Sequence, residues 1–220
     1  VATGLASVLV AAVGTVVHYV EVNECWHRLA PLVVYFGGAS RLFNQGANPE
    51  AGTLVGEVVL RAMRDGNRAD RETLLVASGA GPGRSLVELG CADGHLLLQL
   101  AEACAADKAG TPTGRVLGVD VSAGAVQASN RRLLRLGDDV RVEALAVKLD
   151  FAASGSGSTP VLPAPDCSVD AVLHSHCIYF WPDLAAGAKE IARVLRPGGL
   201  HAFVVAPPAV LAAHKKRPGT

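Results

Sequence analysis

The chain has 220 residues, half of them hydrophobic, and its 20 Lys and Arg balance its 20 Asp and Glu. This length is enough for one full domain plus an appendage. A net charge of zero argues against a protein that coats nucleic acid, and the sequence carries no strong nucleic-acid signal. Five cysteines without a C-x-x-C pair argue against a disulfide framework or a structural zinc site. We therefore expect reduced thiols in an intracellular protein.

Residues 1–66 are expected to form an apolar, helical N-terminal extension. Residues 3–20 are an uncharged run of 18 residues, which reaches the lower length limit of a membrane-spanning helix. A helix buried against its own domain or against a partner protein fits the same run, so both alternatives stay open. Residues 49–64 have the apolar spacing of an amphipathic helix, and Asn48 is placed to cap it.

A charged segment at residues 65–72 is expected to be solvated and to lead into a linker that covers residues 67–84. From Ser85 on, short β-rich runs alternate with helical runs, which is typical of βαβ units. The sequence therefore predicts an α/β fold over residues 85–206, a Rossmann-like, doubly wound and mainly parallel sheet, followed by a tail at 207–220. The expected strands are 85–89, 115–120, 140–147, 169–174 and 200–206, and the expected helices are 95–108, 123–136 and 182–195.

A glycine turn, Glu88-Leu89-Gly90-Cys91-Ala92-Asp93-Gly94, follows the first expected strand. Glycine lets the backbone turn sharply and lets a ligand approach without a Cβ in the way. The amides of the turn and of the next helix N-terminus can then bind the carboxylate of a small ligand. The spacing is not G-x-G-x-x-G, which argues against a dinucleotide-dependent dehydrogenase.

Acidic residues follow the next two expected strands. Asp120, with Val121 after it, is placed to accept hydrogen bonds from both ribose hydroxyls of an adenosine ligand, or else to cap the following helix. Asp150 is placed to accept from an adenine amino group while Phe151 or Leu149 packs on the ring, or else simply begins a Gly/Ser-rich loop.

The fourth expected strand opens into a polar and aromatic loop that contains His174-Ser175-His176-Cys177 and I-Y-F-W-P-D, and R-V-L-R-P-G-G ends the next helix. With the glycine turn and Asp120, this order of signatures resembles the class I S-adenosylmethionine-dependent methyltransferases over about residues 85–206. The resemblance implies S-adenosylmethionine as the cofactor, with its methionine end at the glycine turn. The implied cofactor contacts are Glu88, Gly90, Ala92, Gly94, Asp120, Val121, Asp150, Phe151 and His174.

The reaction of that family is an in-line displacement at a sulfonium methyl, in which the protein mainly aligns the reactants and excludes water. A base is needed only where the acceptor must lose a proton, and His174, His176 and Tyr179 are the titratable residues best placed for that role. Packed side chains without a catalytic role are the alternative. We expect no metal site here, because successive residues of an extended segment face opposite ways.

The sequence departs from the family at two places. Ala92 stands where glycine is usual, and its Cβ costs roughly 1–2 kcal/mol if the backbone has a positive φ. After residue 206 the usual helix and strand pair are missing, so the sheet is expected to lack its last strands. Two functions stay open: methyl transfer to an unknown acceptor, and a catalytically degenerate accessory subunit of a membrane-bound, for example mitochondrial, assembly. Residues 1–66 and the C-terminal edge would then contact the membrane or a partner protein.

Overall fold

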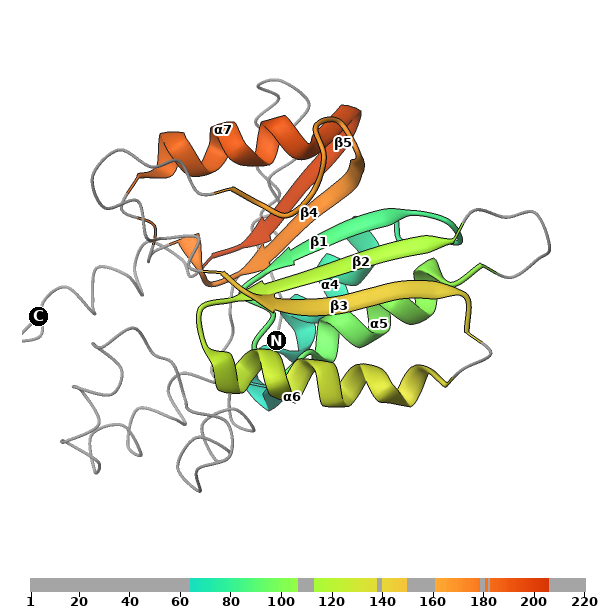
Figure 1. Ribbon diagram of the computed structural model, residues 1–220. Coiled ribbons are helices and arrows are strands. Elements are labelled where there is room, and N and C mark those ends of the chain that lie inside the picture. Colours follow the sequence, from blue (N-terminus) through green and yellow to red (C-terminus); the bar gives the residue numbers. More distant parts are fainter. Residues whose placement is uncertain are drawn as a thin grey trace, which may run out of the picture.

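A five-stranded, all-parallel sheet forms the centre of the molecule, with the strand order β3-β2-β1-β4-β5 (Figure 1). The computed structural model describes residues 64–106, 113–137, 140–149, 161–178, 181 and 183–205. The order of the strands reverses between β1 and β4, and ligands of such sheets bind beyond the strand ends at this point. The elements are α4 (Arg68–Ala77), β1 (Ser85–Leu89), α5 (His95–Cys104), β2 (Gly114–Asp120), α6 (Ala123–Leu133), the 3₁₀ turn η1 (Leu134–Leu136), β3 (Val142–Lys148), β4 (Val169–Ser175), α7 (Leu184–Val194) and β5 (Leu195–Val204).

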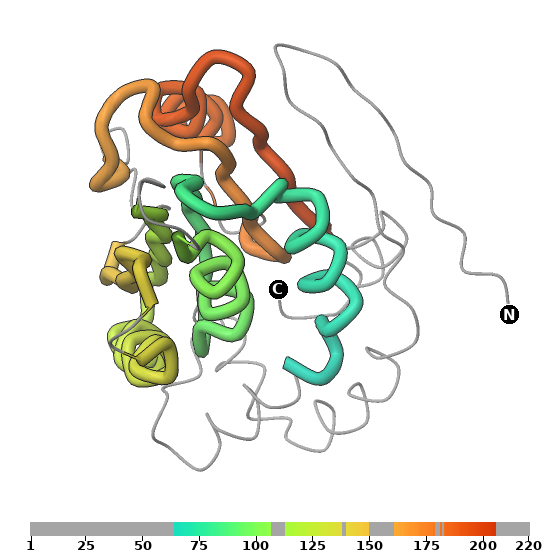
Figure 2. The backbone as a smooth tube through the Cα atoms, turned by 90° about the vertical axis from the view of Figure 1, so that its right-hand side faces the viewer, coloured from blue at the N-terminus to red at the C-terminus, as the bar shows by residue number. Residues whose placement is uncertain are grey.

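Helices cover both faces of the sheet, as the alternating sequence pattern predicted. Helices α4, α5 and α6 lie on one face and α7 lies on the other (Figures 1 and 2). The alternation of side chains along each strand feeds two separate cores. In β1, for example, Leu86 packs into the core under α5, whereas Val87 packs into the core under α7. Every residue of β4 up to His174 is buried, as expected for a central parallel strand.

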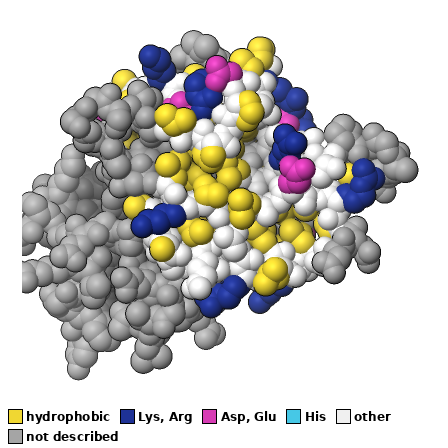
Figure 3. Space-filling view, viewed as in Figure 1, with side chains coloured by type: hydrophobic (Ala, Val, Ile, Leu, Met, Phe, Trp, Pro, Cys, Tyr) yellow, Lys and Arg dark blue, Asp and Glu magenta, His cyan; other side chains and the backbone are white. Residues whose placement is uncertain are grey.

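The face that carries α7 is only partly covered. Helix α7 packs mainly on β5, and apolar side chains of β2 and β3 remain visible beside it (Figure 3). Leu145 is 54% exposed, while Leu117 and Val147 are partly buried against the core under α7. The two faces of the sheet therefore differ in how far helices shield them within the described residues.

The prediction of a solvated linker from residue 65 onward is wrong over residues 68–77, because these residues form helix α4. The helix packs on α5, β4 and β5, and its Leu74 is only 1% exposed. The helix is amphipathic, since Asp70 and Leu74 lie four residues apart on one buried face. The pattern is hard to recognise in the sequence because one of these two buried residues is charged. Arg68 and Glu72 form an exposed ion pair at 2.9 Å on the surface of the same helix.

The Arg-Pro-Gly-Gly segment, expected to turn the chain between a helix and a strand, lies instead inside β5. Leu195 already pairs with Val169, and regular pairing resumes only where Leu200 pairs with Ala171. Gly198 has a φ of +78° within this irregular stretch. The segment is thus a bulge in the strand, and the regular part of β5 begins at the predicted residue.

Several predictions lie outside the described residues. They concern the apolar run at 3–20, the amphipathic helix at 49–64 apart from Arg64, the site residues Asp150, Phe151 and Tyr179, and the tail at 207–220. Within the part of the chain that the structure describes, every helix is too short or too polar to cross a membrane. The remaining strands and helices begin within about two residues of their predicted starts.

Candidate functional site

The glycine turn lies at the carboxyl end of β1, at the reversal of strand order. Gly90 and Gly94 have φ values of +73° and +75°. A Cβ on Gly94 would lie 2.7 Å from the Cα of Ser129, so glycine is required for α5 to approach α6. The amide of Gly90 donates to the carbonyl oxygen of Val119 at 2.8 Å, which ties the turn to β2.

Ala92 has a φ of +48°, so the position does require the left-handed backbone that favours glycine. Two hydrogen bonds hold the residue there. Its amide donates to Oδ2 of Asp120 at 2.9 Å, and its carbonyl oxygen accepts from the hydroxyl of Ser129 at 2.8 Å. The turn therefore forms with alanine in place of glycine, at the cost of local strain.

Asp120 ends β2 and lies against the glycine turn. Its Oδ1 accepts from the amide of Ser122 and its Oδ2 from the amide of Ala92, both at 2.9 Å. Burial raises the pKa of this carboxyl, and the backbone hydrogen bonds oppose that rise. The alternative role as a helix cap is wrong, because the Ser122 hydroxyl accepts from the Ala125 amide and caps α6. The Val121 amide is a third backbone donor to this carboxylate. The two oxygens offer about four lone-pair sites, so one is left for a ligand.

Glu88 is a buried acid at the end of β1. The residue is 7% exposed, and its Oε2 is buried without a hydrogen-bond partner in the described part of the chain. Burial, followed by the negative charges of Asp120 and Asp93, raises the pKa of this carboxyl well above its usual range. A buried acceptor amid negative charge suits a ligand that brings a cation or a hydrogen-bond donor.

His174, at the end of β4, is fully buried in an aromatic cluster on the α7 face. Its ring stacks on Phe203 with centroids 4.8 Å apart, and Trp181 lies at 5.0 Å. Its Nε2 lies 3.1 Å from Nε2 of His201, and its Nδ1 is buried without a hydrogen bond among the described residues. Burial, with His201 and His176 nearby, lowers the pKa of His174 well below its usual range.

His176, the other described histidine predicted for this loop, has different surroundings. Its Nε2 lies 3.0 Å from Oδ2 of Asp70 on α4. Its neighbour Cys177 lies over the glycine turn, because a Cβ on Gly90 would come 3.2 Å from the Cys177 Cβ. The structure thus places Glu88, Asp120 and the loop after β4 around the same strand ends, but it separates the partners of His174 and His176.

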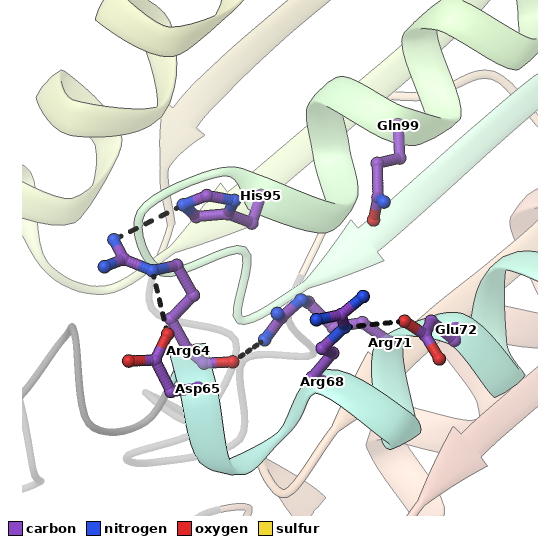
Figure 4. Close-up of a pocket in the computed structure, with 7 residues that line it drawn as sticks. All are labelled: Arg64, Asp65, Arg68, Arg71, Glu72, His95 and Gln99. Carbon is purple, nitrogen blue, oxygen red and sulfur yellow. Dashed lines mark hydrogen bonds and ion pairs between the residues drawn. The ribbon is translucent and has the colours of Figure 1, made fainter.

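Arg71 and Asp70 of α4 are candidate site residues that the sequence analysis missed, because it predicts a linker over their segment. The Arg71 guanidinium donates to the carbonyl oxygen of Arg64 at 2.6 Å and forms no ion pair among the described residues. Burial lowers its pKa, while the carboxylates of Asp93 and Glu88 oppose that change. It lines a pocket of about 310 Å³ between α4 and α5 (Figure 4). The lining residues are Arg64, Asp65, Arg68, Arg71, Glu72, His95 and Gln99.

Sequence comparison decides the family. The profile of a protein family described as a methyltransferase domain, Methyltransf_11, matches residues 87–203. The chain belongs to this family. The match runs from within β1 into β5, so it contains the glycine turn, Asp120 and the loop after β4.

Similar proteins include a nocamycin O-methyltransferase from Saccharothrix syringae, 33% identical over 54% of this chain and 36% of the relative. A demethylmenaquinone methyltransferase from Symbiobacterium thermophilum is 30% identical over 54% of this chain and 41% of the relative. The chain thus spans about two fifths or less of the length of these curated relatives. Among solved structures, a SAM-dependent methyltransferase from Aquifex aeolicus is similar with a TM-score of 0.47 and 22% identity, over 64% of this chain and 67% of that one.

Proposed function

We propose that this protein binds S-adenosylmethionine at the carboxyl ends of β1 and β2 and transfers its methyl group to an acceptor. The observation that carries the proposal is the orphaned carboxylate oxygen of Glu88, buried beside Asp120 under the glycine turn. A buried acceptor without a partner costs free energy, on the order of 1–3 kcal/mol, unless a ligand satisfies it. The chain belongs to a family of methyltransferase domains, and S-adenosylmethionine carries an ammonium group that can donate to this oxygen.

The described residues fit the parts of S-adenosylmethionine. Glu88 suits the ammonium group of the methionine end, and the half-buried Arg71, which lacks a carboxylate partner among the described residues, suits its carboxylate. Asp120 suits the ribose hydroxyls, since its carboxylate ends β2 and backbone amides fill only part of its roughly four lone-pair sites. Contacts of Asp150 and Phe151 with adenine and of Val121 with the nucleoside are further parts of the proposal.

When bound, the cofactor supplies an electrophilic methyl group on a sulfonium sulfur. The protein's own residues then have to orient the acceptor and keep water away. The aromatic cluster of His174, Trp181 and Phe203 provides an apolar wall beside β4. His174, His176 and Tyr179 are the candidates to take a proton from an acceptor that must lose one. The acceptor itself stays undefined.

The alternative is an accessory subunit that keeps the fold without the activity. It would contact a membrane or a partner protein through residues 1–66 and the C-terminal edge, in a mitochondrial assembly for example. Ala92 was its main local support, but the turn is formed and Asp120 is held in place despite that alanine. The two functions differ in cofactor binding: a methyltransferase must bind S-adenosylmethionine, whereas an accessory subunit without activity is expected not to bind it.

Calorimetric titration of the full chain with S-adenosylmethionine tests the proposal. We expect saturable binding, and we expect Arg71→Gln to weaken it about 10-fold, which is the loss of about 1.4 kcal/mol from one charge-assisted bond. Arg68→Gln is the matched control on the same helix, because the exposed Arg68 pairs with Glu72. Absence of binding up to millimolar ligand would refute the proposed function. Equal losses in both variants would refute the assignment of Arg71.

A further inference from the structure

Two side chains of helix α6 bind the backbone of the glycine turn. The hydroxyl of Ser129, which is fully buried, donates to the carbonyl oxygen of Ala92 at 2.8 Å. The guanidinium of Arg132, one helical turn further on, donates to the carbonyl oxygen of Asp93 at 2.6 Å and to its carboxylate at 2.9 Å. Helix α6 therefore holds two successive carbonyl groups of the turn.

Ser129 lies close to the turn because residue 94 is glycine. A Cβ on Gly94 would lie 2.8 Å from the Ser129 oxygen and 2.9 Å from its Cβ. The Sγ of Cys91 lies 3.6 Å from the same oxygen. A hydroxyl carries one hydrogen, and Ser129 donates it to Ala92, so the thiol is the donor in the contact with Cys91. The hydroxyl is therefore fixed in direction by both of these neighbours.

Ala92 depends on these hydrogen bonds because its φ of +48° is unfavourable for a residue with a Cβ. The peptide group before it donates through the Ala92 amide to Oδ2 of Asp120 at 2.9 Å. The peptide group after it accepts from Ser129 through the Ala92 carbonyl oxygen. A rotation of either peptide group that relieved the strain would break one of the two bonds. The Ser129 hydroxyl thus helps to keep the Ala92 amide directed at Asp120.

The bond from Ala92 differs from the other backbone bonds of Asp120. The amides of Val121 and Ser122 belong to the two residues that follow Asp120, so they move with it. The Ala92 amide instead belongs to the glycine turn, and it ties the carboxylate at the end of β2 to the turn at the end of β1. The proposed function puts the ribose at the first and the methionine end at the second. The spacing between these two parts of the site therefore depends on the conformation of Ala92.

Building on the proposed function, we propose that Ser129 is a positioning residue for the cofactor, and that its hydroxyl lets alanine stand at position 92 of a turn that binds S-adenosylmethionine. The hydroxyl holds Ala92 in the left-handed conformation, and the Ala92 amide in turn holds Asp120. Glycine adopts this conformation without strain. Cofactor binding should therefore depend strongly on Ser129 when residue 92 is alanine and only weakly when it is glycine.

Calorimetric titration of the full chain with S-adenosylmethionine, with Ser129→Ala introduced into two backgrounds, tests this dependence. In the wild-type background Ser129→Ala should raise the Kd about 10-fold, because the strain of the left-handed alanine is then no longer opposed. In the Ala92→Gly background the same substitution should raise the Kd by no more than about three-fold. Ser168→Ala is the matched control and should leave the Kd unchanged, since the Ser168 hydroxyl also donates to a backbone carbonyl oxygen, that of Pro165, but at the amino end of β4.

Amide hydrogen exchange of residue 92, followed by NMR in the full chain without cofactor, measures how firmly the residue is held. Ser129→Ala should speed this exchange about 10-fold with alanine at position 92 and by no more than about three-fold with glycine there. An unchanged Kd in Ser129→Ala, or equal losses of affinity in the two backgrounds, would overturn the proposal and leave Ser129 a packing residue of α6. If the wild type fails to bind S-adenosylmethionine, the proposed function fails, while the exchange rates still decide whether Ser129 holds Ala92.

Discussion

The two sides of the proposed cofactor site are built in different ways. On the β1–β2 side, Glu88 lies in β1 and Asp120 ends β2, and the main-chain amides of Ala92 and Ser122 hold Asp120. On the β4–β5 side, imidazoles and aromatic rings meet through side-chain contacts, such as His174 with Phe203 and His201. On the first side, backbone hydrogen bonds fix the position of a carboxylate. The second is formed by side chains of β4, β5 and the loop after β4 that contact one another.

The two sides also differ in how far apart in sequence their residues lie. The first side is built mainly from residues 88–94 and 120–122, two short segments at the ends of the neighbouring strands β1 and β2, with Arg71 of α4 beside them. The second side brings α4, β4 and β5 together, and the Asp70–His176 pair joins residues 106 positions apart. Changes on the first side should therefore alter the stability of the turn and cofactor affinity, and changes on the second should alter proton chemistry.

The largest effect is expected from Gly94→Ala. The new Cβ would lie 2.7 Å from the Cα of Ser129, and the residue has a φ of +75°. Left-handed strain and overpacking together should lower the free energy of unfolding by about 2–5 kcal/mol. Chemical denaturation measures the loss, with Gly137→Ala as the control. Gly137 also has a positive φ, but a Cβ added there would have no atom within 4 Å, so a similar loss in both variants would contradict the packing argument.

Asp120→Ala should be the next largest change and should act on the cofactor. The loss of hydrogen bonds from a carboxylate costs about 1.5–3 kcal/mol, which corresponds to roughly 10- to 150-fold weaker binding of S-adenosylmethionine. Glu143→Ala on β3 is the control, because that carboxylate forms an exposed ion pair with Arg115. An unchanged affinity of Asp120→Ala in calorimetry would show that the ribose assignment is wrong.

The pH dependence of stability tests the β4–β5 side through His201. Burial lowers the pKa of this histidine from 6.5 to about 4. Its contribution to stability is therefore complete above pH 6.5, and it is lost as the pH falls toward 4, because the unfolded chain takes up a proton that the folded chain does not. His201→Gln should make the loss of stability with falling pH less steep by up to about 1.4 kcal/mol per pH unit. Equal slopes in the two proteins between pH 6.5 and 4 would contradict this account.

Ala92→Gly should have the smallest effect. It relieves the strain of a φ of +48°, but it also increases the conformational entropy of the unfolded chain. These terms largely cancel, so we expect the variant to be more stable by about 0.5 kcal/mol. Thermal unfolding would show the change as a rise of the melting temperature by about 1–2 °C. A variant that is destabilised by more than about 1 kcal/mol would mean that the alanine packs favourably in the turn.

The contrast between the two sides also explains what the sequence could predict. The sheet, its parallel strands and the turn after β1 follow from local patterns: glycine positions, short β-rich runs, and the acids Asp120 and Asp150 at or just after the ends of two expected strands. Helix α4 escaped prediction because four of its first five residues are charged, and Leu74 is the only apolar residue on its buried face. Asp70 and Arg71 were missed with it. The bulge in β5 escaped because Pro197, Gly198 and Gly199 are also the residues of a turn, and only pairing with β4 distinguishes the two.

A crystal structure of the full chain with S-adenosylmethionine tests the central claim most directly. We expect cofactor density above Gly90, with the ribose hydroxyls within hydrogen-bond distance of Asp120 and the ammonium group near Oε2 of Glu88. Density elsewhere on the molecule, or a ribose that makes no contact with Asp120, would contradict the account.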